Sequence, residues 1–179
     1  MKIDEYKKLL KSASIREASF GLATIHLFSE NELNEAQIGY SIDPNENSLI
    51  GNKEGDWREN WFVIGRYALC GDPIFIDLEI DDFPVLTAMH GIGYWNEQEV
   101  AESFNGFVKV LELVDKISKD RNTSVLLEQN PLSSKEKRKI LEEIREILPN
   151  TSTDFWENLL ALEPWEVYLP ANHKPKLPK

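Results

Sequence analysis

Carboxylate and amide side chains between residues 43 and 54 follow a spacing close to that of a calcium-binding loop. Asp43, Asn45 and Asn47 alternate with other residues, and Glu54 stands at the twelfth position of such a loop. Ser48, however, occupies the position where the loop needs glycine for its sharp turn, and the flanking residues are typical of strands rather than helices. The sequence therefore favours a plain turn, and no metal site is predicted.

Three further features could support catalysis. Gly91-x-Gly93 is similar to part of a phosphate-binding loop, but the third glycine is missing. His90 precedes this pair, and neither of the other two histidines stands at a spacing that would make it a second metal ligand. Cys70 is the only cysteine and would need a histidine nearby in space to act as a nucleophile. We expect His90 to be structural and Cys70 to be a small buried hydrophobe, with no catalytic residue and no cofactor.

The acidic residues are more informative, because they are concentrated in one part of the chain. The whole 179-residue chain carries a net charge of -11, and residues 30–102 hold 16 Asp or Glu against three Lys or Arg. Such a field repels nucleic acid and accelerates encounter with basic proteins. The candidate contacts with a basic partner lie around two turns: Asp72, Asp77, Glu79, Asp81 and Asp82. Aspartates at such positions also cap turns, which is the structural alternative.

Tryptophan is a common anchor at protein interfaces. Trp57 and Trp95 stand beside charged or polar residues and are the aromatic candidates for partner contact, whereas Trp61 lies within an apolar run and is expected in the core.

These residues lie on or between predicted strands. Alternating apolar residues predict strands over 36–42, 61–65, 74–79 and 85–89, and Gly71-Asp72-Pro73 forms the turn of a central hairpin. Four consecutive short strands indicate an antiparallel meander.

Apolar residues at helical spacing predict helices before and after these strands. Helices are predicted over 2–16, from a capping box at Asn96 and Glu99 to residue 114, from Ser133 to the proline at 149, and from about residue 153. Gly106 inside the second helix indicates close packing against the sheet. The fold class is α+β, a central antiparallel sheet with flanking helices concentrated in the C-terminal half. Residues 1–170 are expected to form a single domain, and 171–179 a flexible tail.

Residues 61–111 resemble the SUKH superfamily, which joins fungal regulators of cell-wall synthesis to bacterial immunity proteins against polymorphic toxins. The resemblance rests on an apolar strand ending in Ile64-Gly65, the Gly71–Asp77 turn and strand, Pro84-Val85-Leu86 followed by His90-Gly91, and Ala101-x-Ser103-Phe104-x-x-Phe107. The N-terminal third departs from the family, since it lacks the usual Leu-Pro pair and Asn-Gly-Gly turn. The resemblance implies an α+β fold whose central sheet offers one face to a partner, and a role in neutralising a toxin by binding it.

The expected function is therefore that of a non-enzymatic protein-binding module, an immunity protein whose partner is a basic toxin domain. Two alternatives stay open: a regulatory scaffold in cell-envelope or cell-wall synthesis, and a metal-dependent hydrolase that uses the acidic residues from Asp72 to Asp82. One cysteine allows no intrachain disulfide, which favours a reducing cytoplasm. The apolar run at 18–28 is too short to span a bilayer, so no membrane insertion is expected.

Overall fold

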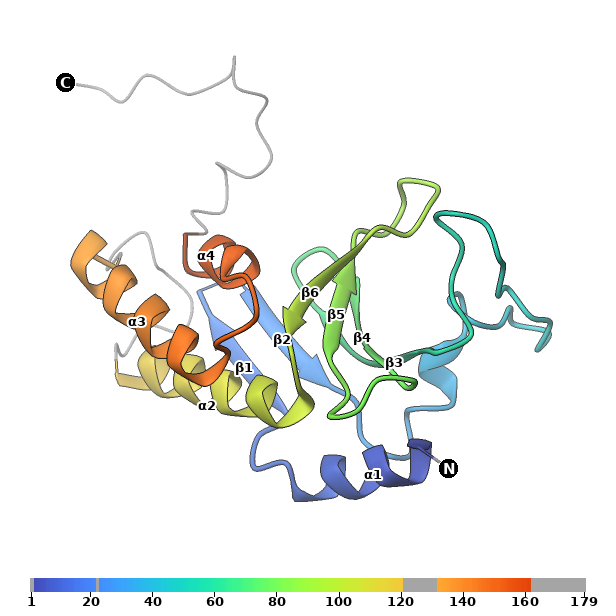
Figure 1. The fold of residues 1–179 in the computed structure, drawn as a ribbon, viewed down its shortest axis with the longest axis horizontal. Helices are drawn as coiled ribbons and strands as arrows, with labels where there is room; N and C mark the ends of the chain where they lie inside the picture. Colours follow the sequence, from blue (N-terminus) through green and yellow to red (C-terminus); the bar gives the residue numbers. More distant parts are fainter. Residues whose placement is uncertain (1, 22, 121–131, 162–179) are drawn as a thin grey trace, which may run out of the picture.

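The computed structural model describes residues 2–21, 23–120 and 132–161. Its elements are α1 (Lys2–Ser12), β1 (Glu17–Phe20), β2 (Ala23–Leu27), the short 3-10 helix η1 (Glu35–Gln37), β3 (Trp61–Tyr67), β4 (Asp72–Asp77), β5 (Val85–Ala88), β6 (Glu97–Ala101), α2 (Phe104–Asp120), α3 (Ser134–Ile147) and α4 (Asp154–Ala161). The predicted α+β class is confirmed, with the later helices in the C-terminal half (Figure 1).

A six-stranded sheet forms the centre of the molecule. Its spatial order is β1 to β6, and every neighbouring pair is antiparallel, so the sheet is a meander. The predicted central hairpin is confirmed as β3 and β4, and the strand predicted next is β5. A bulge between Val63 and Gly65 interrupts the register of β3.

Helices cover one face of this sheet. The helices α2, α3 and α4 lie together on one side of the sheet, and α1 runs beneath the sheet (Figure 1). Tyr6 and Leu10 of α1, alternate residues of β1 and β2, and the apolar stripe of α2 share one large core. Buried and partly exposed residues alternate in β2, because its apolar residues point to the helices and its polar residues point away.

Loops cover the opposite face. Residues 29–60 contain only η1 as a regular element and extend on the side of the sheet away from α2 and α3 (Figure 1). Gln37 holds this segment in place, since its buried amide donates to the carbonyl of Val63 at 2.9 Å and accepts the Val63 N–H at 3.0 Å. The Gln37 side chain thus takes the place of a pairing strand residue beyond the end of β2.

The strand predicted over 36–42 is wrong. This segment forms η1 and a series of turns, and Ile38 is exposed rather than packed in a sheet. Asp43 explains part of the difference, because its carboxylate accepts the N–H groups of Asn45 and Asn47 and so stabilises a turn. The two strands that pair instead, β1 and β2, were not predicted.

The helix predicted to begin at Asn96 begins later. Residues Glu97–Ala101 form β6, and α2 starts at Phe104, where the Ser103 hydroxyl accepts the N–H of Gly106 at 3.1 Å. Pairing with β5 places Val100 and Ala101 in the core, which outweighs the local helix signal.

Gly106 also packs against a different neighbour from the one predicted. A Cβ at this position would lie 2.5 Å from Cδ2 of Leu148, so α2 approaches the end of α3 here rather than the sheet. The other predicted helices are confirmed, although α1 ends at Ser12 instead of continuing to residue 16. The helix α3 begins with a capping box formed by Ser133 and Glu136, and α4 begins at Asp154. The predicted tail lies outside the described residues.

Candidate protein-binding surface

A cluster of aromatic rings lies beneath the loops of the loop-covered face. Trp57 is at its centre, with ring centroids 4.9 Å from Phe75, 5.3 Å from Trp61, and 5.2 Å from both Trp95 and Tyr40. These five residues come from the 29–60 segment, β3, β4 and the loop after β5. The cluster therefore joins segments that are far apart in the sequence into one platform.

Polar contacts connect the cluster to its surroundings. Arg58 places its guanidinium 4.6 Å from the centroid of the Trp61 ring and forms an ion pair with Glu97 at 2.6 Å. Trp57 Nε1 donates to the carbonyl of Trp61 at 3.3 Å. Burial, and to a lesser extent the negative charge of Asp72, raise the pKa of the half-buried Tyr40 hydroxyl.

Trp57 is 1% exposed, so the expectation that it lies on the surface is wrong. Its polar sequence neighbours belong to a loop that folds over the sheet, which local sequence does not reveal. Trp95 is half-buried, and Trp61 is buried, as predicted.

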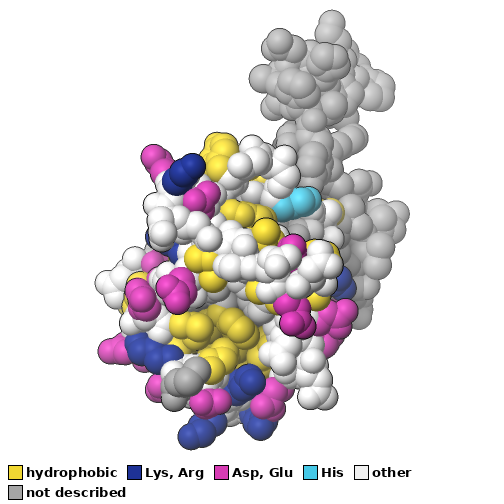
Figure 2. Space-filling view, turned by 90° about the vertical axis from the view of Figure 1, so that its right-hand side faces the viewer, with side chains coloured by type: hydrophobic (Ala, Val, Ile, Leu, Met, Phe, Trp, Pro, Cys, Tyr) yellow, Lys and Arg dark blue, Asp and Glu magenta, His cyan; other side chains and the backbone are white. Residues whose placement is uncertain are grey.

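Around the cluster, two loops expose large apolar side chains. We call this set the apolar rim: Ile38, Leu49, Ile50, Met89, Ile92 and Tyr94, of which Met89 is 60% and Tyr94 56% exposed. The two loops touch, since the N–H of Trp95 donates to the carbonyl of Gly55 at 2.8 Å. Figure 2 shows this side of the molecule, with hydrophobic side chains lying between acidic ones.

Acidic side chains predominate around the apolar rim. Residues 38–60 and 89–99 contain seven acidic residues (Asp43, Glu46, Glu54, Asp56, Glu59, Glu97 and Glu99) and two basic ones, Lys53 and Arg58. Arg58 is already paired with Glu97. The surface therefore combines exposed apolar area with a negative field, which suits a basic protein partner.

Asp72 lies at the end of β4 nearest the apolar rim. Its Oδ1 accepts the backbone N–H of His90 at 2.9 Å and Nδ1 of His90 at 2.8 Å, and its Oδ2 accepts the thiol of Cys70 at 2.9 Å. The structure thus brings together Cys70, Asp72 and His90, which sequence reasoning considered separately.

This trio does not have the order of a cysteine nucleophile and its base. The carboxylate lies between the thiol and the imidazole, whereas nucleophile activation needs the imidazole next to the sulfur. Burial, followed by the hydrogen bond to Asp72, raises the pKa of the Cys70 thiol to about 11. Cys70 is therefore a protonated hydrogen-bond donor, half-buried rather than the buried hydrophobe expected.

The other acidic candidates lie at the opposite end of β4. Asp77 is 8% exposed and accepts hydrogen bonds from the side chain of Asn60 and from the N–H of Glu79. The exposed Asp81 forms an ion pair with Lys2 of α1 at 2.9 Å, which lowers the pKa of Asp81. Asp82, at a φ of 64°, accepts the N–H of Phe104 through its carbonyl. This turn connects α1 and α2 to the sheet.

The candidate acidic residues consequently do not form one site. Asp72 and Asp77 are the two ends of a six-residue strand, about 17 Å apart at the rise of an antiparallel strand. Among the described residues, no group of three His, Cys, Asp or Glu is placed to hold a metal ion. Within the same residues, no helix is long and apolar enough to cross a membrane.

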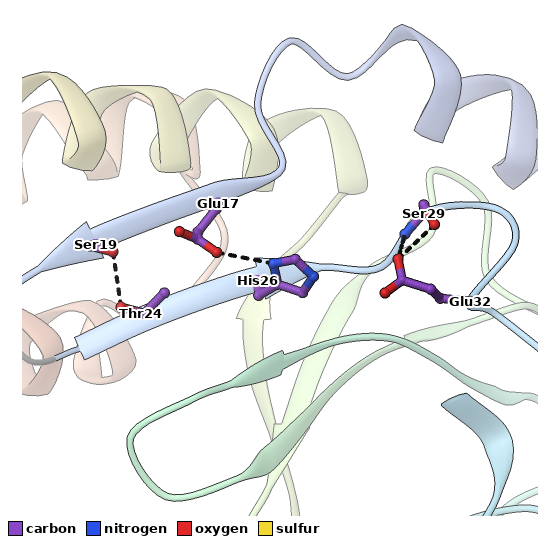
Figure 3. Close-up of polar contacts among 6 residues, drawn as sticks. All are labelled: Glu17, Ser19, Thr24, His26, Ser29 and Glu32. Carbon is purple, nitrogen blue, oxygen red and sulfur yellow. Dashed lines mark hydrogen bonds and ion pairs between the residues drawn. The ribbon is translucent and has the colours of Figure 1, made fainter. Parts of the chain in front are cut away.

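A polar strip lies along β1 and β2, on the strand side facing away from the helices (Figure 3). His26 Nδ1 lies 3.2 Å from Glu17, and Ser19 and Thr24 share a hydrogen bond of 2.9 Å. These are directly opposed cross-strand pairs, which stabilise a hairpin. Farther along the chain, the N–H and hydroxyl of Ser29 both donate to Glu32, and these bonds lower the pKa of Glu32.

One groove lies elsewhere, between α1 and α2, with a volume of about 380 Å³. Its walls mix apolar and charged residues, namely Leu9, Ser12, Ala13, Phe104, Asn105, Val108, Lys109 and Glu112. It is remote in the fold from the apolar rim.

Sequence reasoning did not find the apolar rim. The predicted strands over 36–42 and 85–89 include Ile38 and Met89, whose exposure the alternation does not indicate, and no pattern in the sequence predicts that Leu49, Ile50, Ile92 and Tyr94 share an exposed surface. The available signal was the placement of Ile92 and Tyr94 next to Gly91 and Gly93, because glycine-rich segments form exposed loops. Comparison with family models, with curated proteins and with solved structures gives no match to this chain.

Proposed function

We propose that the protein is a non-enzymatic binding module of the SUKH type, which neutralises a cognate bacterial toxin by covering the toxin's active surface. The observation that carries this proposal is the apolar rim, which exposes six large hydrophobic side chains on two touching loops. Exposed apolar groups gathered in this way mark interaction surfaces.

The charge around the rim supports a basic partner. Seven acidic residues against two basic ones would attract a basic toxin domain, and toxins that cleave nucleic acid need basic surfaces for their substrate. The α+β fold with a central antiparallel sheet also agrees with what the family resemblance implies. In a cytoplasmic immunity protein, the apolar rim would supply affinity and the acidic residues would supply encounter rate and selectivity.

The test compares a double substitution with a single substitution, both at exposed apolar residues. Met89→Ser with Ile92→Ser alters the apolar rim, whereas Ile80→Ser alters an equally apolar residue that is 52% exposed on the distant β4–β5 turn. Each purified protein is used as bait for the products of neighbouring genes, and the affinity for the recovered protein is then measured. We expect a basic protein whose toxicity is blocked by co-expression, and an affinity at least about tenfold weaker for the rim variant only.

Two results would contradict the proposal. Equal affinity of the rim variant and the wild type would remove the apolar rim from the interface. A partner that is acidic, or one whose toxicity is unchanged by co-expression, would contradict the immunity role and favour a regulatory scaffold.

A further inference from the structure

The loop between β5 and β6, residues 89–96, carries half of the apolar rim but has few contacts of its own. Gly91 and Gly93 adopt φ values of 78° and 86°, and a Cβ built on either would meet no other atom within 4 Å. Two such glycines give this segment unusual backbone freedom in solution. Its shape therefore depends on the contacts at its two ends.

At one end, the loop is attached to the aromatic cluster. The N–H of Trp95 donates to the carbonyl of Gly55 at 2.8 Å, and the Trp95 ring packs against Trp57 and Tyr40. Tyr94 approaches Gly55 so closely that a Cβ on this glycine would lie 2.7 Å from Cβ of Tyr94.

At the other end, Asp72 is the attachment point. A carboxylate can only accept hydrogen bonds, so both His90 nitrogens that contact Oδ1 donate to it, at 2.8 and 2.9 Å. The side chain of Asp72 is 16% exposed, whereas that of His90 is 51% exposed. The Cys70 thiol donates to Oδ2 and so fixes the orientation of the carboxylate.

We infer that Asp72 is a positioning residue, which holds residues 89–96 in the shape that presents Met89, Ile92 and Tyr94 to the partner. This inference rests on the proposed binding function and changes the role expected for Asp72 from the sequence, namely direct contact with the partner. Both of its oxygens are occupied within the chain, and its charge acts by retaining His90 at the start of the loop.

Amide hydrogen exchange on the isolated full-length protein tests this directly. In Asp72→Ala, we expect exchange of the His90 and Trp95 amides, which donate to Asp72 and to the Gly55 carbonyl, to accelerate by about tenfold or more, because the hydrogen bonds that hold the start of the loop to a charged acceptor are lost. Asp81→Ala is the matched control: it removes the same charge beyond the opposite end of β4, at a side chain that is 95% exposed, and should leave this loop unchanged. Unchanged exchange in Asp72→Ala would overturn the inference.

Two further variants separate positioning from general destabilisation. Asp72→Asn keeps one oxygen that can accept from His90, and should restore most of the protection. His90→Ala removes the ring contact from a half-exposed residue and should accelerate the same amides to a smaller extent, even if Asp72→Ala does not fold. Faster exchange throughout the sheet would contradict the positioning role of Asp72. So would exchange in the loop of His90→Ala that is no faster than in the wild type. Since no partner is present, failure of the binding proposal would leave these results unaffected.

Discussion

The two faces of the sheet are closed in different ways. On the helix-covered face, Phe104, Phe107 and Trp156 are each no more than 1% exposed, and the apolar side chains of α1 to α4 form one continuous core. On the loop-covered face, Trp57 and Phe75 are as deeply buried, but the cluster around them is small and the apolar rim is open to solvent.

The two faces are closed differently because helices and loops satisfy their backbone hydrogen bonds in different ways. A helix satisfies its own N–H and C=O groups and presents a continuous apolar stripe, so it can seal a sheet completely. The loops must satisfy their backbone through side chains such as Gln37 and Asp72, and they cannot bury every apolar residue that they carry. The helix-covered face is therefore closed by one continuous core, and the loop-covered face is the one where large apolar side chains stay exposed.

The largest effect is expected from opening a cavity in the helix-covered face. Phe107 is 0% exposed and its ring lies 6.0 Å from that of Trp156, so Phe107→Ala should lower the free energy of unfolding by about 4 kcal/mol. Urea titration measures this change. Ile92→Ala on the apolar rim is the comparison and should change stability by less than about 0.5 kcal/mol. Similar losses for the two variants would remove the distinction between the faces.

A smaller loss is expected when the loop segment is released from the sheet. Gln37→Ala deletes the amide that bonds both backbone groups of Val63, and should cost about 2 kcal/mol by leaving them without partners. Hydrogen exchange should accelerate at Val63 more than within α2, since the opening is local. Gln98→Ala, at an exposed glutamine of β6, is the control. Uniform acceleration throughout the molecule would show that the two faces unfold together.

Tyr6→Phe should change the free energy of unfolding less than Phe107→Ala or Gln37→Ala, by no more than about 1 kcal/mol at neutral pH. The reason is that the Tyr6 hydroxyl is buried with no hydrogen-bond partner in the described structure. Burial, opposed by Arg16, raises the pKa of Tyr6 far above its ordinary value of 10.0. As the pH rises above 10, the unfolded chain loses this proton while the folded protein retains it, so stability falls.

Unfolding curves between pH 8 and 11 should show this alkaline loss reduced in Tyr6→Phe. Tyr40→Phe should reduce it less, because Tyr40 on the loop-covered face is only half-buried. An equal alkaline loss in the wild type and in Tyr6→Phe would mean that Tyr6 is not sealed within the core.

Local signals succeeded where one element determines its own structure. Ser133 and Glu136 form the predicted capping box because both partners lie within a single helical turn. The apolar residues of β3 and β4 formed the predicted hairpin because a short turn leaves them little choice of partner. Asn96 and Glu99 offered a similar capping signal but lie in or beside β6, because pairing with β5 buries Val100 and Ala101.

The sequence by itself determined the α+β class, the central hairpin, the helical C-terminal half and the acidic character of the middle of the chain, all of which depend on residues near one another or on composition. Tertiary structure alone decided the exposure of each residue. It buried Trp57 under a loop, exposed Met89 and Tyr94, and joined Asp72 to His90, 18 positions away. These outcomes depend on which segments fold over each face of the sheet, and no short stretch of sequence contains that information.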